Sequence, residues 1–187
     1  MSRVNRLISR FQRFVALPWE ERVSGAERVW FLVYDKIDER RIRARIDEFE
    51  IATTRAGHGW KLCDLTDSFP RWMAEQDYRD SYFEDPEALE LLLPDYHEYV
   101  VEQVREALNA EDVGPSTVVA ILGIASLFGF TRASKVLEDP TVKGNIQGRM
   151  MVFFPGEHED NNYRLLDARD GWNYMAVPIT AHDGAET

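Results

Sequence analysis

One stretch of the sequence, from Met150 to Ile179, constrains the fold more than any other. It opens with an apolar run, 150–154, that predicts a buried strand. Pro155 and Gly156 predict a sharp end to this strand, because proline lacks the N–H of a ladder and glycine permits positive φ. A polar loop then begins, and in α/β sheets the carboxyl end of a strand is where sites usually form.

Four further segments predict the rest of the sheet. Continuous apolar runs indicate strands at 28–34, 59–65 and 116–122, and a last strand is expected at 174–177, closed by Pro178. An amphipathic helix precedes the first strand, and a long helix capped by Asp38 follows it and stops near Gly57. Strand, helix and strand in this spacing form a βαβ unit, expected to be parallel and right-handed. We therefore predict an α/β fold, Rossmann-like, with about five mostly parallel strands and helices on both faces.

Residues 66–115 show no strand pattern and predict a helical insertion after the second strand. The net charge of the chain, −11, is concentrated there: from Glu75 to Asp112 there are thirteen acidic residues against Arg79 and Arg105, whereas the remainder has twenty of each sign. The insertion is also rich in aromatic residues, among them Trp72, Tyr82 and Phe83. Such a surface is a candidate protein-binding face, and the alternative is that these rings cover the sheet.

The first helix carries a row of arginines that includes Arg6 and Arg10. This row is either a docking face for an acidic partner or DNA, or an ordinary solvated face. The acidity of the chain disfavours general nucleic-acid binding, because like charges repel the phosphate backbone.

The glycine-rich turn from Gly123 to Gly129 lies between a predicted strand and a helix, where phosphate-binding loops are built. It does not match a Walker A motif, because the glycines are six positions apart rather than five and Phe130 occupies the lysine position. The turn is therefore expected to be apolar, with Phe128 as a candidate partner contact.

Carboxylates follow several of the predicted strands, at Asp35, Asp64, Asp67, Glu157, Glu159 and Asp160. A parallel sheet would collect them at one edge, where they could hold Mg²⁺ or Mn²⁺. Their spacing matches no metal motif, and we expect neither metal nor cofactor. Glu157, Asn161, Asn162 and Arg169 instead mark a loop that is either a site or a structural brace.

The length of 187 residues fits one domain, 1–187, with a polar tail at 180–187 that is expected to be disordered. No apolar run reaches the length of about 18 residues that a membrane-spanning helix needs. The single cysteine, Cys63, is predicted to be a buried thiol and fits a reducing cytoplasm.

Several stretches resemble one protein family. FFPGEHEDNNYRLLDARDGWNYMAVPIT is similar to the C-terminal signature of the BrxB family, a component of BREX anti-phage defence systems. ERVWFLVYD, AGHGWKLCDLTD, GIASLFGFTRASK and LPWEE match the same pattern, so the resemblance covers almost the whole chain.

The resemblance implies a small non-enzymatic subunit that binds the PglZ-type alkaline-phosphatase-like protein, with the BREX methyltransferase assembly as the wider context. Host DNA methylation and phage exclusion would then depend on it indirectly. Two alternatives stay open: a degenerate nucleotide- or metal-dependent hydrolase or nuclease, and an adaptor that contacts DNA through the arginines of the first helix.

Overall fold

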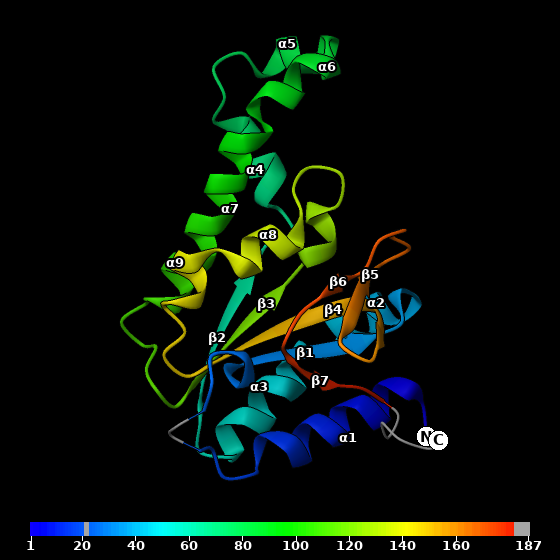
Figure 1. The fold of residues 1–187 in the computed structure, drawn as a ribbon, viewed down its shortest axis with the longest axis vertical. Helices are drawn as coiled ribbons and strands as arrows, with labels where there is room; N and C mark the ends of the chain where they lie inside the picture. Colours follow the sequence, from blue (N-terminus) through cyan, green and yellow to red (C-terminus); the bar gives the residue numbers. More distant parts are fainter. Residues whose placement is uncertain (21–22, 182–187) are drawn as a thin grey trace.

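The computed structural model describes residues 1–20 and 23–181. Within these residues, five parallel strands form the centre of the molecule in the order β2-β3-β4-β1-β7 (Figure 1). Their bounds are β1 Val29–Tyr34, β2 Gly59–Asp64, β3 Thr117–Leu122, β4 Arg149–Glu159 and β7 Val177–Ile179. Two short strands, β5 (Asn162–Leu165) and β6 (Trp172–Asn173), are antiparallel and continue from the end of β4. The fold is therefore α/β with a mixed sheet.

Helices cover both faces of the sheet (Figure 1). One face packs against α1 (Arg3–Val15), α2 (Glu39–Arg43) and α3 (Ile46–Arg55). The other face packs against α4 (Ser68–Ala74), α7 (Leu93–Leu108), α8 (Ala133–Glu138), α9 (Pro140–Lys143) and the 3₁₀ turn η4 (Ile124–Leu127). Shorter elements are η1 (Ala26–Arg28), η2 (Lys36–Asp38), η3 (Glu90–Leu92), α5 (Arg79–Glu84) and α6 (Pro86–Leu89). None of the helices in the described part of the chain is both long and apolar enough to cross a bilayer.

The central strand β1 explains why the predicted strands are apolar throughout. Its side chains alternate between the two faces, so Phe31 joins the core under α7 while Leu32 joins the core over α1 and α3. All six residues of β1 are buried. A strand that is buried on both faces must read as a continuous apolar run, and the predictions for β1, β3 and the start of β4 are confirmed for this reason. The prediction of β2 is also confirmed, but β2 is an edge strand whose residues are mostly exposed or half-buried.

The predicted end of the fourth strand at Pro155 and Gly156 is wrong. β4 continues to Glu159, because its ladder to β3 ends at Val152 and a new ladder to β5 begins at Gly156. Proline is tolerated where the pairing changes partner. Gly156 is needed for close approach rather than for a turn, since a Cβ there would lie 2.1 Å from the backbone oxygen of Arg164. The expected polar loop is thus mostly a β-hairpin.

Three other details differ from the prediction. The last strand of the parallel sheet is Val177–Ile179 rather than 174–177, and Pro178 lies inside it, as an edge strand allows. The helix after Asp38 is divided in two at 44–45. β1 and β2 are parallel as expected, but β3 and β4 lie between them. The tail predicted to be disordered falls, from residue 182 onward, outside the described residues.

Candidate functional site

The helical insertion is an arm that projects from the sheet (Figure 1). We use "arm" for residues 68–108, which run from α4 through α5, α6 and η3 to the end of α7. α7 is the rigid element of the arm, since Pro94 stands in its first turn and its 16 residues span about 24 Å at 1.5 Å per residue. The inner face of α7 is buried on the sheet through a stripe that includes Val100, Val104 and Leu108. The insertion predicted at 66–115 thus has a packed base and a free end.

The base of the arm is held by an aromatic cluster. The fully buried Tyr96 ring lies 5.2 Å from the ring of Trp72 and 5.3 Å from that of Phe69, and Phe69 stacks on Phe130 at 3.9 Å. The Tyr96 hydroxyl also hydrogen-bonds the buried Ser68 hydroxyl at 2.7 Å. Trp72, a predicted contact residue, is only 5% exposed, so it packs the base instead of facing a partner.

The free end of the arm has the opposite character. We use "tip" for residues 77–91, and its elements α5, α6 and η3 bury no residue. Tyr78, Phe83 and Leu91 are 72%, 68% and 84% exposed. Phe83 is among the predicted contact residues and Tyr78 belongs to the same predicted aromatic face, whereas Leu91 is not predicted by the sequence. Tyr82, also predicted, is half-buried and packs against the core.

The glycine turn presents its apolar end to solvent only at Phe128. Gly123 and Gly129 both have positive φ, and Gly123 is required there because a Cβ would lie 2.5 Å from the backbone nitrogen of Thr66. Ile124 and Leu127 are buried, whereas Phe128 is 55% exposed. The turn is therefore filled with apolar side chains, and Phe128 is its exposed member.

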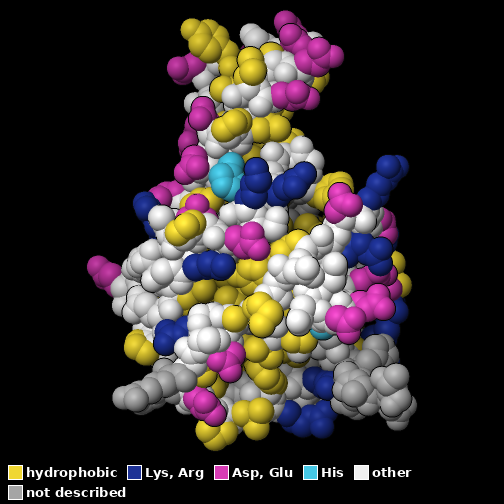
Figure 2. All heavy atoms as spheres, viewed as in Figure 1, with side chains coloured by type: hydrophobic (Ala, Val, Ile, Leu, Met, Phe, Trp, Pro, Cys, Tyr) yellow, Lys and Arg dark blue, Asp and Glu magenta, His cyan; other side chains and the backbone are white. Residues whose placement is uncertain are grey.

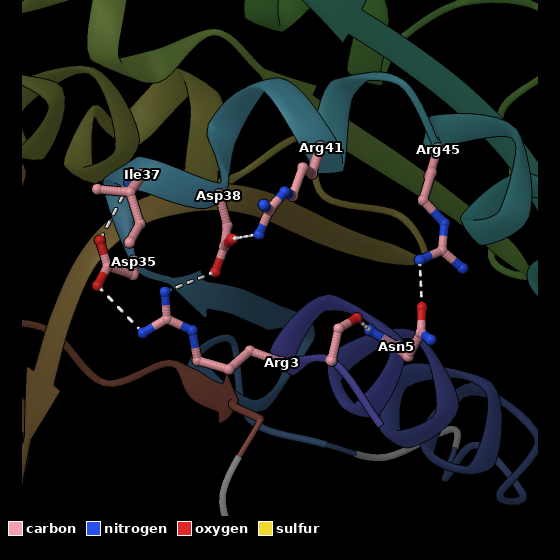
Figure 3. A network of polar contacts seen from close by, with 8 residues as sticks. Arg3, Asn5, Asp35, Ile37, Asp38, Arg41 and Arg45 are labelled. Atoms are coloured by element: carbon pink, nitrogen blue, oxygen red, sulfur yellow. Dashed lines mark hydrogen bonds and ion pairs between the residues drawn. The ribbon is translucent and has the colours of Figure 1, made fainter.

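A cavity of about 580 Å³ lies at the carboxyl ends of β1, β4 and β7. Asp35 and Glu157, two of the predicted carboxylates, line it together with His158 and the start of α1. Its lining also includes Asp38, whose buried carboxylate accepts from Arg3 at 3.1 Å and from Arg41 at 3.2 Å (Figure 3). This size and this edge of the sheet are typical of ligand pockets, although each of its acidic side chains is already engaged in an ion pair.

The hairpin formed by β4 and β5 borders a second, polar hollow of about 460 Å³. Four predicted site residues line this hollow together: Glu157, Asn161, Asn162 and Arg169. Glu157 is paired with Arg164, and the Asn162 side chain lies so close to Gly171 that a Cβ there would be 1.7 Å from its Oδ1. The prediction missed Arg164 and Asn173, which line the hollow because β5 and β6 fold back beside β4.

Of the remaining carboxylates of the predicted edge, Glu159 and Asp160 also line the polar hollow, whereas Asp64 and Asp67 lie apart from both cavities. Asp64, at the end of β2, accepts from the backbone N–H of Thr66 at 2.9 Å and lines neither cavity. Asp67 precedes α4 without making a side-chain cap. Within residues 1–20 and 23–181, no three His, Cys, Asp or Glu side chains come together as metal ligands would.

The arginines of α1 do not form a free row. Arg6 and Arg10 are half-buried, and Arg6 donates to the backbone oxygen of Met1 at 3.0 Å. Arg3 is held by Asp35 and Asp38. Cys63 is buried as predicted, and burial raises the pKa of its thiol to about 12, so it stays protonated at neutral pH.

The amino edge of the sheet carries a histidine that stacks on a tryptophan ring. His58 stacks on Trp19 with ring centroids 3.7 Å apart, and its Nδ1 lies 2.9 Å from the Ser116 hydroxyl. Burial, and then the nearby positive charge of Arg149, lower the pKa of His58. Burial also lowers the pKa of His158.

We expect these histidines to make the protein less stable at mildly acidic pH. Because the pKa of each is lower in the folded state than the value of about 6.5 expected when unfolded, the unfolded chain binds more protons in this range. The stability that the two neutral histidines contribute is fully present above about pH 6.5 and is lost as the pH falls toward their pKa in the folded protein. Urea unfolding from pH 7.5 to 5.5 should show this decline, and it should be shallower in His58→Phe, which keeps a ring on Trp19. An equal decline in this variant would contradict the assignment to His58.

Comparison of the chain with models of known protein families, with curated proteins and with solved structures returned no match.

Proposed function

We propose that this chain is a non-enzymatic, cytoplasmic protein-interaction subunit of a BREX phage-defence system. Its partner in this proposal is the PglZ-type protein, within a wider assembly with the BREX methyltransferase, and the chain supports host DNA methylation and phage exclusion. The observation that supports the interaction role is the exposure of Tyr78, Phe83 and Leu91 in the tip of the arm. The resemblance of five stretches of the sequence to the BrxB family supports the choice of system and partner. We also propose that the parallel part of the sheet is Rossmann-like.

The tip supports a binding role because it gains little from its own packing. α5 and α6 have six and four residues, which is too short for stable isolated helices in water. Phe83 of α5 is exposed, and Tyr82 and Leu89 are only half-buried, although burial of such groups is what usually stabilises short helices. A partner that covers Phe83 and Leu91 would supply this burial, and large apolar side chains are frequent anchors of protein interfaces.

Binding of the purified full-length chain to the purified PglZ-type protein tests the proposal. We expect a complex that co-elutes in size-exclusion chromatography and gives a heat signal in calorimetry at about 10 µM, since specific complexes usually have dissociation constants below this level. The absence of both signals would refute the proposed partner.

A second candidate function, that of a degenerate nucleotide- or metal-dependent hydrolase or nuclease, is favoured by one observation: the cavity of about 580 Å³ at the carboxyl edge. It predicts a thermal shift with ATP, Mg²⁺ or Mn²⁺ that is lost in Glu157→Ala, since Glu157 lines both cavities. In the third alternative, a DNA adaptor, binding to DNA would weaken with salt and in Arg6→Ala with Arg10→Ala.

A further inference from the structure

The tip combines exposed apolar anchors in one small region. Tyr78 directly precedes α5, Phe83 lies in α5 and Leu91 in η3. α5 contacts α6, and α6 contacts η3, so the three short elements lie close together at the end of the arm. Figure 2 shows hydrophobic side chains reaching the surface at this end, farthest from the sheet. Large side chains grouped in this way can enter a single hollow on a partner.

The charge of the tip is one-sided. It carries six exposed carboxylates: Asp77, Asp80, Glu84, Asp85, Glu87 and Glu90. Its single base, Arg79, lies 3.7 Å from Asp80 and cannot balance them. Acidic side chains lie next to the hydrophobic ones in Figure 2. Such a surface repels nucleic acid and anionic lipid and attracts a basic protein surface.

Contacts at the base of the arm fix the position of α7, which leads to this surface. The Tyr96 cluster fixes the start of α7 against α4 and the turn at Phe130. His97, the residue after Tyr96, makes a hydrogen bond of 2.8 Å between its Nδ1 and the Thr131 hydroxyl. The anchors are therefore held at the end of a stiff support, which reduces the entropy lost on binding.

From this arrangement we infer that the tip docks into an apolar hollow on a partner protein that is bordered by lysine and arginine side chains, with Phe83 and Leu91 as anchors. This inference rests on the proposed function in one respect: the arm is taken as a protein-docking element. It does not require the partner to be the PglZ-type protein.

Photo-crosslinking of the full chain tests the inference inside cells that carry its native neighbouring genes. p-Benzoylphenylalanine replaces Phe83 in one variant and Met175, which is 67% exposed and lies outside the tip, in the other. We expect an adduct at position 83 that is absent at position 175, and mass spectrometry should place it beside clustered Lys and Arg residues of one protein. No adduct at position 83, or an adduct on an acidic surface, would overturn the inference.

The identity of the crosslinked protein separates this inference from the proposed function. A basic site on the PglZ-type protein supports both. A basic site on a different protein supports the docking chemistry and removes the proposed partner. A PglZ complex that forms without an adduct at position 83 keeps the proposed function and refutes the tip as its docking element.

Binding kinetics with the crosslinked protein then separate anchors from charges. Phe83→Ala with Leu91→Ala should weaken binding at least about tenfold, mainly through faster dissociation, and Met175→Ala, at an exposed position outside the tip, should not change it. Glu84→Gln with Glu87→Gln should slow association and flatten its salt dependence. The control, Asp47→Asn with Glu50→Gln, removes two exposed charges from α3 and should leave association unchanged. Equal effects of the tip and α3 variants would contradict the role of the tip carboxylates.

Discussion

Replacing Phe31 with alanine is expected to destabilise the protein by about 3–5 kcal/mol, the usual cost of removing a buried aromatic ring from a core. Phe31 is fully buried in β1, between β4 and β7. Its ring stacks on Phe154 and on Tyr174, at 5.2 and 5.3 Å between centroids, and meets the edge of Tyr163 at 4.5 Å. Phe31 thereby joins the parallel sheet to the hairpin, so its loss leaves a cavity that several elements line.

Urea unfolding of the full-length protein measures this effect. Phe31→Ala should lower the midpoint strongly, and Phe128→Ala, which removes a ring of the same size from an exposed position, should change the free energy of unfolding by no more than about 0.5 kcal/mol. Near-ultraviolet circular dichroism should also change in Phe31→Ala, because the ring contacts two tyrosines. Similar stability losses in both variants would show that the Phe31 cluster is not the link described here.

The strands were predictable where both faces are buried, and the predictions failed where pairing depends on a distant partner. β1, β3 and the first part of β4 need apolar side chains at every position, which makes them visible in the sequence. The sequence predicts a strand end at Pro155 because proline has no backbone N–H and cannot donate a hydrogen bond to a neighbouring strand. The strand passes through it because β5, which lies later in the chain, replaces β3 as the neighbour.

The candidate surface was predicted as a region and not as individual residues. Trp72 and Phe83 lie in the same acidic, aromatic segment, yet one is buried at the base and the other is exposed at the tip. No local pattern separates them, because burial depends on where α4 meets Tyr96 and Phe130. The segment from Glu87 to Leu92 holds three leucines among acidic residues, a pattern typical of a helix with a covered face; Leu89 and Leu92 are half-buried, while Leu91 is exposed.

The second large effect is expected at the base of the arm, in Tyr96→Ala. This change removes a fully buried ring from contacts with Phe69 and Trp72 and deprives the buried Ser68 hydroxyl of its partner, so we expect a loss of about 3–5 kcal/mol. Tyr96→Phe keeps the ring and should lose only about 1–3 kcal/mol, the cost of leaving a buried hydroxyl unpaired.

Hydrogen exchange shows which elements Tyr96→Ala destabilises, and partner binding shows whether this local loss affects the interaction. In Tyr96→Ala, amides of α4 and of the first half of α7 should exchange faster than those of β1 and β4, because the aromatic cluster holds the arm while the core on the α1 and α3 face of the sheet is built from other residues. Partner binding should then fall together with arm protection, whereas Phe83→Ala should lose binding with normal protection throughout. Uniformly faster exchange across the sheet in Tyr96→Ala would instead mean that arm and sheet unfold as one unit. In that case the arm could not unfold separately from the sheet on which it packs.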